Sequence, residues 1–95
     1  LELHYQNVLF IVYKLLGFYV QAEYHTSNGR INMVLKTDRY IYVMEFKFDG
    51  SAEEALKQIE EKGYAVPFAN DSRQLIKAGV NFSSKTRNID SWIVD

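Results

Sequence analysis

The chain has 95 residues, of which 47% are hydrophobic and 15% aromatic, so it can bury one small core but not two. Its 11 basic and 12 acidic side chains give a formal net charge of −1, which excludes a protein that holds nucleic acid by phosphate neutralisation alone. The chain has no cysteine, so a disulfide framework and a thiolate zinc site are excluded as well.

The predicted elements alternate between helical and strand patterns. Apolar residues recur at helical spacing up to Gly17, which is a helix stop signal. Asn28-Gly29 is typical of a two-residue hairpin turn between β-type runs. The stretch from Ser51 to Glu54 matches a helix capping box, and Gly63 ends the apolar stripe that follows. In chain order we expect a helix over 5–16, strands over 19–24, 30–35 and 40–48, a helix over 52–62, and strands over 75–82 and 89–94.

An acidic and a basic residue interrupt the longest predicted strand, 40–48. Alternate residues of a strand share a face, so Glu45 and Lys47 project from the same face as Ile41 and Val43. The opposite face is aromatic and apolar, and we expect it to form core rather than a base-stacking platform. A simple cross-strand ion pair is the alternative explanation for the two charges.

The pairing register of the strand over 30–35 with the strand over 40–48 depends on which residues form the turn between them. If Thr37-Asp38 is a two-residue loop, Arg30 faces Glu45, and Asn32 lies diagonal to Glu45 on the same face. The same reasoning for the first hairpin places His25 opposite Asn32. We expect His25 to be a solvated residue near a turn and not a metal ligand.

These residue types suit phosphodiester hydrolysis. A hard divalent cation prefers oxygen ligands, and it can polarise a phosphate and lower the pKa of a bound water. We expect Glu45 to supply a carboxylate and the backbone carbonyl of Phe46 a further oxygen. Lys47 can orient the attacking water or stabilise charge on the phosphate.

The ordered set of motifs resembles the PD-(D/E)xK nuclease superfamily, in particular the nuclease-like domains that follow AAA-type ATPase-like domains in bacterial proteins. The resemblance implies an α/β (α+β) domain with a restriction-endonuclease-like αβββαβ core, in which helices flank a mixed sheet. It also implies Mg²⁺- or Mn²⁺-dependent cleavage of nucleic acid, with DNA as the expected partner, and an upstream ATPase-like domain. The matching stretches are Tyr5-Gln6, Gly29-Arg30-Ile31-Asn32, Glu45-Phe46-Lys47, Gln58-Ile59, Lys62-Gly63-Tyr64-Ala65 and Gly79-Val80-Asn81-Phe82.

The resemblance also implies roles for single residues. Glu45, Lys47 and Asn32 take the catalytic positions, and Asn32, Glu45 and the Phe46 carbonyl take the metal-binding positions. Three further residues resemble supporting positions of the family: Glu2, Gln58 and Tyr64.

One position departs from the family pattern. Asn32 stands where the family has a metal-binding Asp. Three explanations stay open: a degenerate copy, an Asn introduced to disarm the site, or compensation by Glu23 or Glu2. A catalytically inactive module of the same fold that binds nucleic acid or protein is the main rival, and a purely structural domain is the third possibility.

The chain carries no pattern that indicates a membrane or secreted location. Its most apolar stretch, 8–16, contains Lys14 and is shorter than the roughly 18 residues that a membrane-spanning helix needs. We therefore expect no membrane partner, and the absence of cysteine, which fits a reducing compartment, leads us to expect a cytoplasmic protein. The length of the chain predicts a single domain over residues 1–95. Because the sequence starts without Met and shows no leader, we expect it to be a fragment of a longer protein, and the resemblance implies a C-terminal one.

Overall fold

The computed structural model describes residues 2–95, with side chains from Leu3 onward. The expected order of helices and strands is confirmed, with one short 3₁₀ helix in addition. The elements are α1 (Glu2–Leu15), β1 (Tyr19–Thr26), β2 (Gly29–Lys36), β3 (Tyr40–Phe48), α2 (Ala52–Glu61), η1 (Val66–Phe68), β4 (Gln74–Ser83) and β5 (Asn88–Val94).

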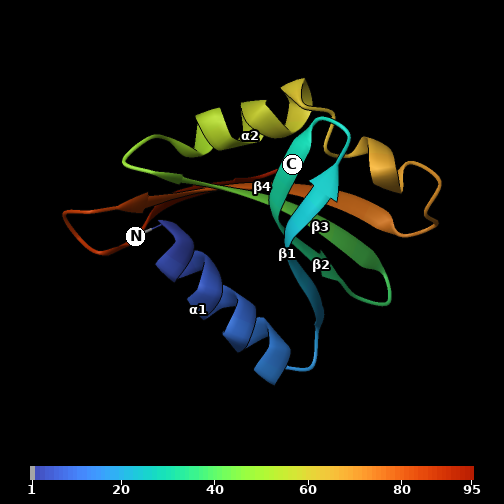
Figure 1. Ribbon diagram of the computed structural model, residues 1–95, viewed down its shortest axis with the longest axis horizontal. Helices are drawn as coiled ribbons and strands as arrows, with labels where there is room; N and C mark the ends of the chain where they lie inside the picture. Colours follow the sequence, from blue (N-terminus) through green and yellow to red (C-terminus); the bar gives the residue numbers. More distant parts are fainter. Residues whose placement is uncertain (1) are drawn as a thin grey trace.

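The strands form one mixed sheet in the order β1-β2-β3-β4-β5. β3 and β4 are parallel, and the other neighbours are antiparallel. A parallel pair needs a long crossover, and α2 supplies it. α1 and α2 lie on opposite sides of the sheet (Figure 1). The expected restriction-endonuclease-like arrangement, a mixed sheet flanked by helices, is confirmed. Among the described residues, no helix has the length and apolar character needed to cross a membrane.

The core is divided by the sheet into two clusters, as the alternation of β3 requires. On the α1 side, Met44 and Phe46 pack with residues of α1 and β4. On the α2 side, Ile41 and Val43 pack with Ile59. Phe46 is only 1% exposed, which confirms that the aromatic face of this strand belongs to the core.

α2 begins with the expected cap and lies very close to β4. The hydroxyl oxygen of Ser51 accepts a hydrogen bond of 3.0 Å from the backbone N–H of Glu54. Ala52 and Ala55 are fully buried on the face of α2 that meets the sheet. Gly79 of β4 lies below them, and a Cβ atom there would be 2.4 Å from the carbonyl oxygen of Ala52. The missing side chain at position 79 therefore allows α2 to approach the sheet.

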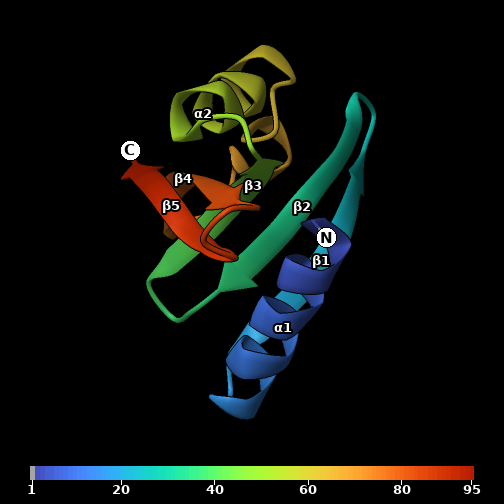
Figure 2. The same ribbon diagram turned by 90° about the vertical axis from the view of Figure 1, so that its left-hand side faces the viewer.

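The first hairpin differs from the expected one. Thr26 pairs with Gly29, so Ser27 and Asn28 form the two-residue loop, and His25 lies opposite Arg30 rather than Asn32. The Thr26 hydroxyl stabilises this turn, because it accepts from the Asn28 N–H at 3.2 Å and donates to the Gly29 carbonyl at 3.0 Å. Figure 2 shows β1 and β2 as a long ribbon that extends beyond the rest of the sheet.

The second hairpin shifts the register by two residues. Lys36 pairs with Ile41, and the backbone N–H of Thr37 donates to the carbonyl of Tyr40 at 2.9 Å, so Asp38 and Arg39 form the loop. The expected pairing of Arg30 with Glu45 is therefore wrong. The reason lies in the turn, where the Thr37 hydroxyl accepts hydrogen bonds from the N–H groups that follow it.

Candidate active site

A fork opens between β2 and β3. The two strands are paired from Lys36↔Ile41 to Met33↔Met44, where their pairing ends. β3 continues as a partner of β4 as far as Phe48↔Phe82. Within the described residues, Asn32 is absent from the pairing of β2 with β3 and from that of β2 with β1. The backbone groups at the fork must therefore find other partners.

Glu45 lies at the fork and is only 2% exposed. One carboxylate oxygen accepts a 2.9 Å hydrogen bond from the backbone N–H of Asn32, and the other accepts a 3.0 Å bond from the side-chain amide of Gln58. Burying a carboxylate is costly unless its oxygens are hydrogen-bonded. These two bonds make the buried position of Glu45 tenable.

Asn32 completes the other half of the fork. Its side-chain oxygen accepts from the backbone N–H of Phe46 at 2.9 Å, and its amide nitrogen donates to Gln6 of α1 at 3.3 Å. Side chains of Asn32 and Glu45 thus replace the missing ladder bonds on both strands. The fork is closed by side chains rather than by backbone pairing.

The expected common face of Asn32 and Glu45 is not found. Ile31 packs in the α2-side cluster and Met33 in the α1-side cluster, although residues two apart share a face in a regular strand. The irregularity at Asn32 thus reverses the alternation. Asn32 reaches toward α1 and Glu45 toward α2, and the two residues meet in the fork from opposite sides of the sheet.

Lys47 joins the same network on the α2 side. Its ammonium donates to the side-chain oxygen of Gln58 at 2.6 Å, while the amide nitrogen of Gln58 donates to Glu45. Gln58 therefore bridges the acid and the base, and both ends fix the orientation of its amide. The structure brings four sequence-predicted residues together: Asn32, Glu45, Lys47 and Gln58.

The network includes two further residues: Gln6, which had no assigned role in the sequence analysis, and Glu23, which was considered there only as a compensating metal ligand. Gln6 is 2% exposed, and its amide nitrogen donates to Glu23 at 3.1 Å. Glu23 has φ of 52°, a conformation that is uncommon for a non-glycine residue. A Gln on the otherwise apolar face of the first helix was the signal that could have identified Gln6. No sequence pattern predicts the backbone conformation of Glu23.

Tyr64 and His25 lie apart from the fork. Tyr64 is buried in the α2-side cluster, where its hydroxyl lies beneath Gly29. The side chain of Glu2 lies outside the described residues. His25 is exposed on the β1–β2 ribbon.

Asn81 is another buried polar residue; it belongs to the matching stretch 79–82, and the sequence analysis assigned it no role. It is 2% exposed and pairs with Lys47 across the parallel strands. Its side-chain oxygen accepts from the Gly50 N–H at 2.9 Å, and its amide nitrogen donates to Asp90 at 3.4 Å. Asn81 thus ties the chain between β3 and α2 to β4, close to Lys47.

The oxygen atoms at the fork are of the kind that a hard cation prefers. Even-numbered residues of β3 direct both backbone groups toward β2, as the bond from Thr37 to Tyr40 shows, so the Phe46 carbonyl also faces the fork. An amide or carbonyl oxygen that accepts one hydrogen bond retains a second lone pair. No group of three or more His, Cys, Asp or Glu side chains within the described residues is arranged to hold a metal ion. The donors of Glu45, Asn32 and Phe46 therefore fit Mg²⁺ or Mn²⁺ in type, but with a single carboxylate.

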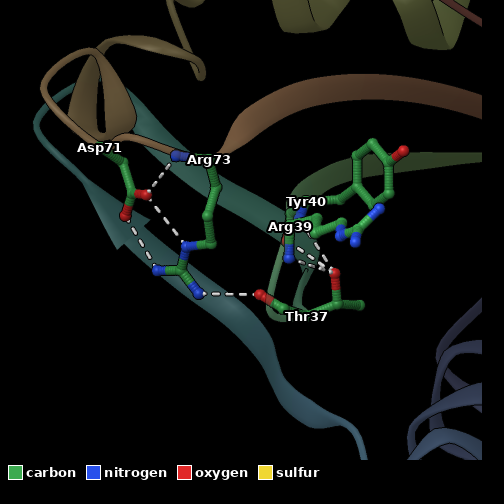
Figure 3. Close-up of polar contacts among 5 residues, drawn as sticks. All are labelled: Thr37, Arg39, Tyr40, Asp71 and Arg73. Atoms are coloured by element: carbon green, nitrogen blue, oxygen red, sulfur yellow. Dashed lines mark hydrogen bonds and ion pairs between the residues drawn. The ribbon is translucent and has the colours of Figure 1, made fainter.

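A hydrogen-bonded ion pair lies beside the start of β3, away from the fork. Figure 3 shows the guanidinium of Arg73 paired with Asp71 through two bonds of 2.9 and 2.8 Å and bonded to the Thr37 carbonyl at 3.2 Å. Hydrogen bonds from Arg73 hold the pKa of Asp71 well below its usual range. A cavity of about 570 Å³ adjoins this pair. Its lining residues are Gly17, Phe18, Tyr19, Lys36, Thr37, Asp38 and Arg73, none of which belongs to the fork.

The elements follow the order of a helix, three antiparallel strands, a second helix and a parallel strand, and Glu45 and Lys47 lie beside a fork in the sheet. This arrangement defines a nuclease-like domain of the restriction-endonuclease type. A model of the PD-(D/E)XK nuclease superfamily matches residues 1–92, so the chain belongs to this superfamily. It is also 32% identical over 96 residues to an uncharacterised protein encoded in the 5′ region of vnfD in Azotobacter chroococcum mcd 1. The match covers 99% of this chain but only 19% of that relative. No solved structure matches the chain.

Proposed function

We propose that the chain is a metal-dependent hydrolase of nucleic-acid phosphodiester bonds, with DNA as the substrate, and that Asn32 attenuates its activity. The observation that carries the proposal is the fork itself. Glu45, Asn32 and the Phe46 carbonyl supply oxygens there, and Lys47 is linked to Glu45 through Gln58. An acid, an amide and an amine at one break in a sheet suit the handling of a phosphate.

Each residue has a distinct part in the proposed reaction. Glu45, Asn32 and the Phe46 carbonyl would hold Mg²⁺ or Mn²⁺, which when bound supplies Lewis-acid polarisation and an acidified water. Lys47 is half-buried, and its ammonium group can donate a hydrogen bond to the attacking water or to a phosphate oxygen. Gln58 keeps the Lys47 ammonium and the Glu45 carboxylate at fixed positions.

The basic side chains near Lys47 are an argument for an anionic substrate. A shallow hollow of about 290 Å³ adjoins Lys47 and Gln58. Lys57 and Lys62 also line it, together with two glutamates. Because the net charge of the chain is −1, nucleic acid must be held by such local cations rather than by the overall charge.

The change from Asp to Asn at position 32 removes one negative charge from the cation site. Loss of an outer partner of a metal ligand commonly lowers metal affinity by about 10- to 100-fold, and loss of a ligand's charge should cost at least as much. We therefore expect weak binding of Mg²⁺ to this chain and slow cleavage.

The test is Asn32→Asp, assayed for cleavage of DNA and RNA with and without Mg²⁺ or Mn²⁺. We expect metal-dependent cleavage at least tenfold faster than that of the wild-type chain, and abolition of cleavage by Glu45→Ala in the same background. Asn7→Asp, at an exposed position of α1, is the charge-matched control and should change nothing. If Asn32→Asp, shown to be folded by circular dichroism at the assay temperature, neither binds metal nor cleaves, the catalytic proposal is wrong.

A second candidate is a nuclease-fold module that binds nucleic acid or protein without catalysis. This candidate is favoured because the polar groups at the fork are hydrogen-bonded within the protein: no buried side-chain nitrogen or oxygen among the described residues lacks a hydrogen-bond partner. Fluorescence anisotropy with labelled DNA distinguishes the two candidates. Tight binding that Glu45→Ala leaves intact, without cleavage by Asn32→Asp, would favour the module.

We also propose that residues 1–95 form one domain at the C-terminus of a longer cytoplasmic protein, behind an ATPase-like domain. The curated relative supports a larger protein, because the match covers 19% of its length. The outer face of α1 supports a covering domain, since Ile11 and Leu15 are 57% and 82% exposed. Slower hydrogen exchange of α1 in the full-length protein than in residues 1–95 would support this arrangement, and equal exchange would contradict it.

A further inference from the structure

Four groups form a chain of hydrogen bonds on the α1 side of the fork, and we call it the amide relay. Glu23 accepts from the amide nitrogen of Gln6 at 3.1 Å, and the oxygen of Gln6 accepts from the amide nitrogen of Asn32 at 3.3 Å. The oxygen of Asn32 accepts from the backbone N–H of Phe46 at 2.9 Å. The relay thus runs from β1 through α1 to β2 and β3.

The two ends of the relay determine its direction. The Glu23 oxygen accepts from Gln6, and the backbone N–H of Phe46 can only donate. Two side-chain amides stand between them, and each has one accepting and one donating end. All bonds are made only when Gln6 turns its nitrogen to Glu23 and Asn32 turns its nitrogen to Gln6. Because Gln6 is 2% exposed, an unsatisfied group in the relay would be costly.

We propose that Glu23, acting through Gln6, is a positioning residue that keeps the side-chain oxygen of Asn32 directed at β3, so that positions 23 and 32 are coupled: Asp at position 32 retains full stability only when position 23 changes as well. The proposal deepens the proposed function, because it names what orients one oxygen of that site. It does not depend on hydrolysis, so a chain that cuts nothing can still confirm or refute it.

The coupling follows from what Asp would do at position 32. An Asp still accepts from Phe46, but its second oxygen needs a donor, so Gln6 must reverse its amide. The oxygen of Gln6 then faces the carboxylate of Glu23, and two acceptors oppose each other. With Gln at position 23, the reversed relay is satisfied again, because the new amide nitrogen can donate to Gln6.

The experiment is a double-mutant cycle in EDTA, read out as the midpoint of thermal unfolding. Asn32→Asp should lower the midpoint by roughly 5 to 15 °C, because it leaves a buried acceptor unsatisfied. Glu23→Gln alone should change it by no more than about 3 °C, since the Gln oxygen still accepts from Gln6. The double variant should return to within about 3 °C of the wild-type chain. If Asn32→Asp alone does not fold, recovery of cooperative unfolding when Glu23→Gln is added would equally support the coupling.

Two controls make the result specific. Asn7→Asp combined with Glu23→Gln has the same net charge as the double variant and should show additive effects, because Asn7 is exposed on α1. Gln6→Met interrupts the relay, so in that background the coupling between positions 23 and 32 should disappear. Additive effects of Asn32→Asp and Glu23→Gln in the intact relay, or unchanged coupling with Gln6→Met, would overturn the inference.

Discussion

Gly79→Ala tests whether the close packing of α2 on β4 holds the proposed site together. The new Cβ atom would be 2.4 Å from the carbonyl oxygen of Ala52 and 2.8 Å from the backbone nitrogen of Leu56. Both atoms belong to the helix backbone, so no side-chain rotation can relieve the contact. α2 must instead move away from the sheet by about 1 Å to restore an ordinary van der Waals distance.

The cost of this movement can be estimated. Overpacking a well-filled core commonly costs about 1–3 kcal/mol, and a contact with backbone belongs at the upper end of that range. A domain of this size loses roughly 4–8 °C in its unfolding midpoint for each kcal/mol, so we expect a decrease of about 12–24 °C. The same movement lengthens the 3.0 Å bond from Gln58 to Glu45 beyond hydrogen-bonding range.

Thermal unfolding and the NMR signal of the Gln58 side-chain amide are the measurements. Gly50→Ala is the matched control, because a Cβ atom there would be 3.4 Å from the nearest atom, the Cβ of Lys47. The control should unfold within about 4 °C of the wild-type chain. If Gly79→Ala behaves like Gly50→Ala and leaves the amide signal of Gln58 unmoved, the packing of α2 does not position the site as we argue.

Three further predictions follow from single contacts. Glu45→Gln should lower the free energy of unfolding by about 1–3 kcal/mol, because the new amide nitrogen would face the amide nitrogen of Gln58, and both are donors. Urea denaturation measures this change, and an unchanged midpoint would contradict the hydrogen bond between these two side chains. Hydrogen bonds from Arg73 lower the pKa of Asp71, so the contribution of this carboxylate to stability is complete above about pH 4 and is lost as the pH falls further. The difference in thermal unfolding midpoint between the wild-type chain and Asp71→Asn should therefore become smaller under acid conditions. A difference that does not change with pH would refute this prediction. Ser51→Ala removes the cap of α2 and should cost about 1 kcal/mol, or roughly 4–8 °C in a thermal scan, whereas Ser51→Asp should cost little.

The elements that the sequence predicted well are those with a strong local pattern. The third strand was expected over 40–48 and occupies Tyr40–Phe48, because its alternation is unbroken and polar turns flank it on both sides. The α2 helix begins after Ser51 as expected, because a serine followed by Glu54 stabilises that start in any context. Local patterns of this kind do not depend on the remainder of the chain.

The register and the fork could not be predicted in the same way. Both hairpins are two residues away from the expected pairing, because Thr26 and Thr37 close the turns with their hydroxyl groups and the Asn-Gly pair does not occupy the loop. The reversal of faces at Asn32 depends on Glu45 and on Gln6, which lie 13 and 26 residues away in the chain. Contacts at such separations leave no periodic signal in the sequence.

The cost of the fork itself favours a site over a structural ion pair. A hairpin of β2 and β3 that stayed paired beyond Met33↔Met44 would satisfy its backbone without any side chain. Instead the chain separates these strands, buries the carboxylate of Glu45, and uses the side chains of Asn32 and Gln58 to satisfy the groups that are left. A buried charge of this kind contributes little to stability, because apolar residues of similar volume commonly do as well or better. The arrangement is therefore difficult to explain by folding alone, and this supports the proposal that the oxygen atoms at the fork, with Lys47 beside them, bind a cation and a phosphate.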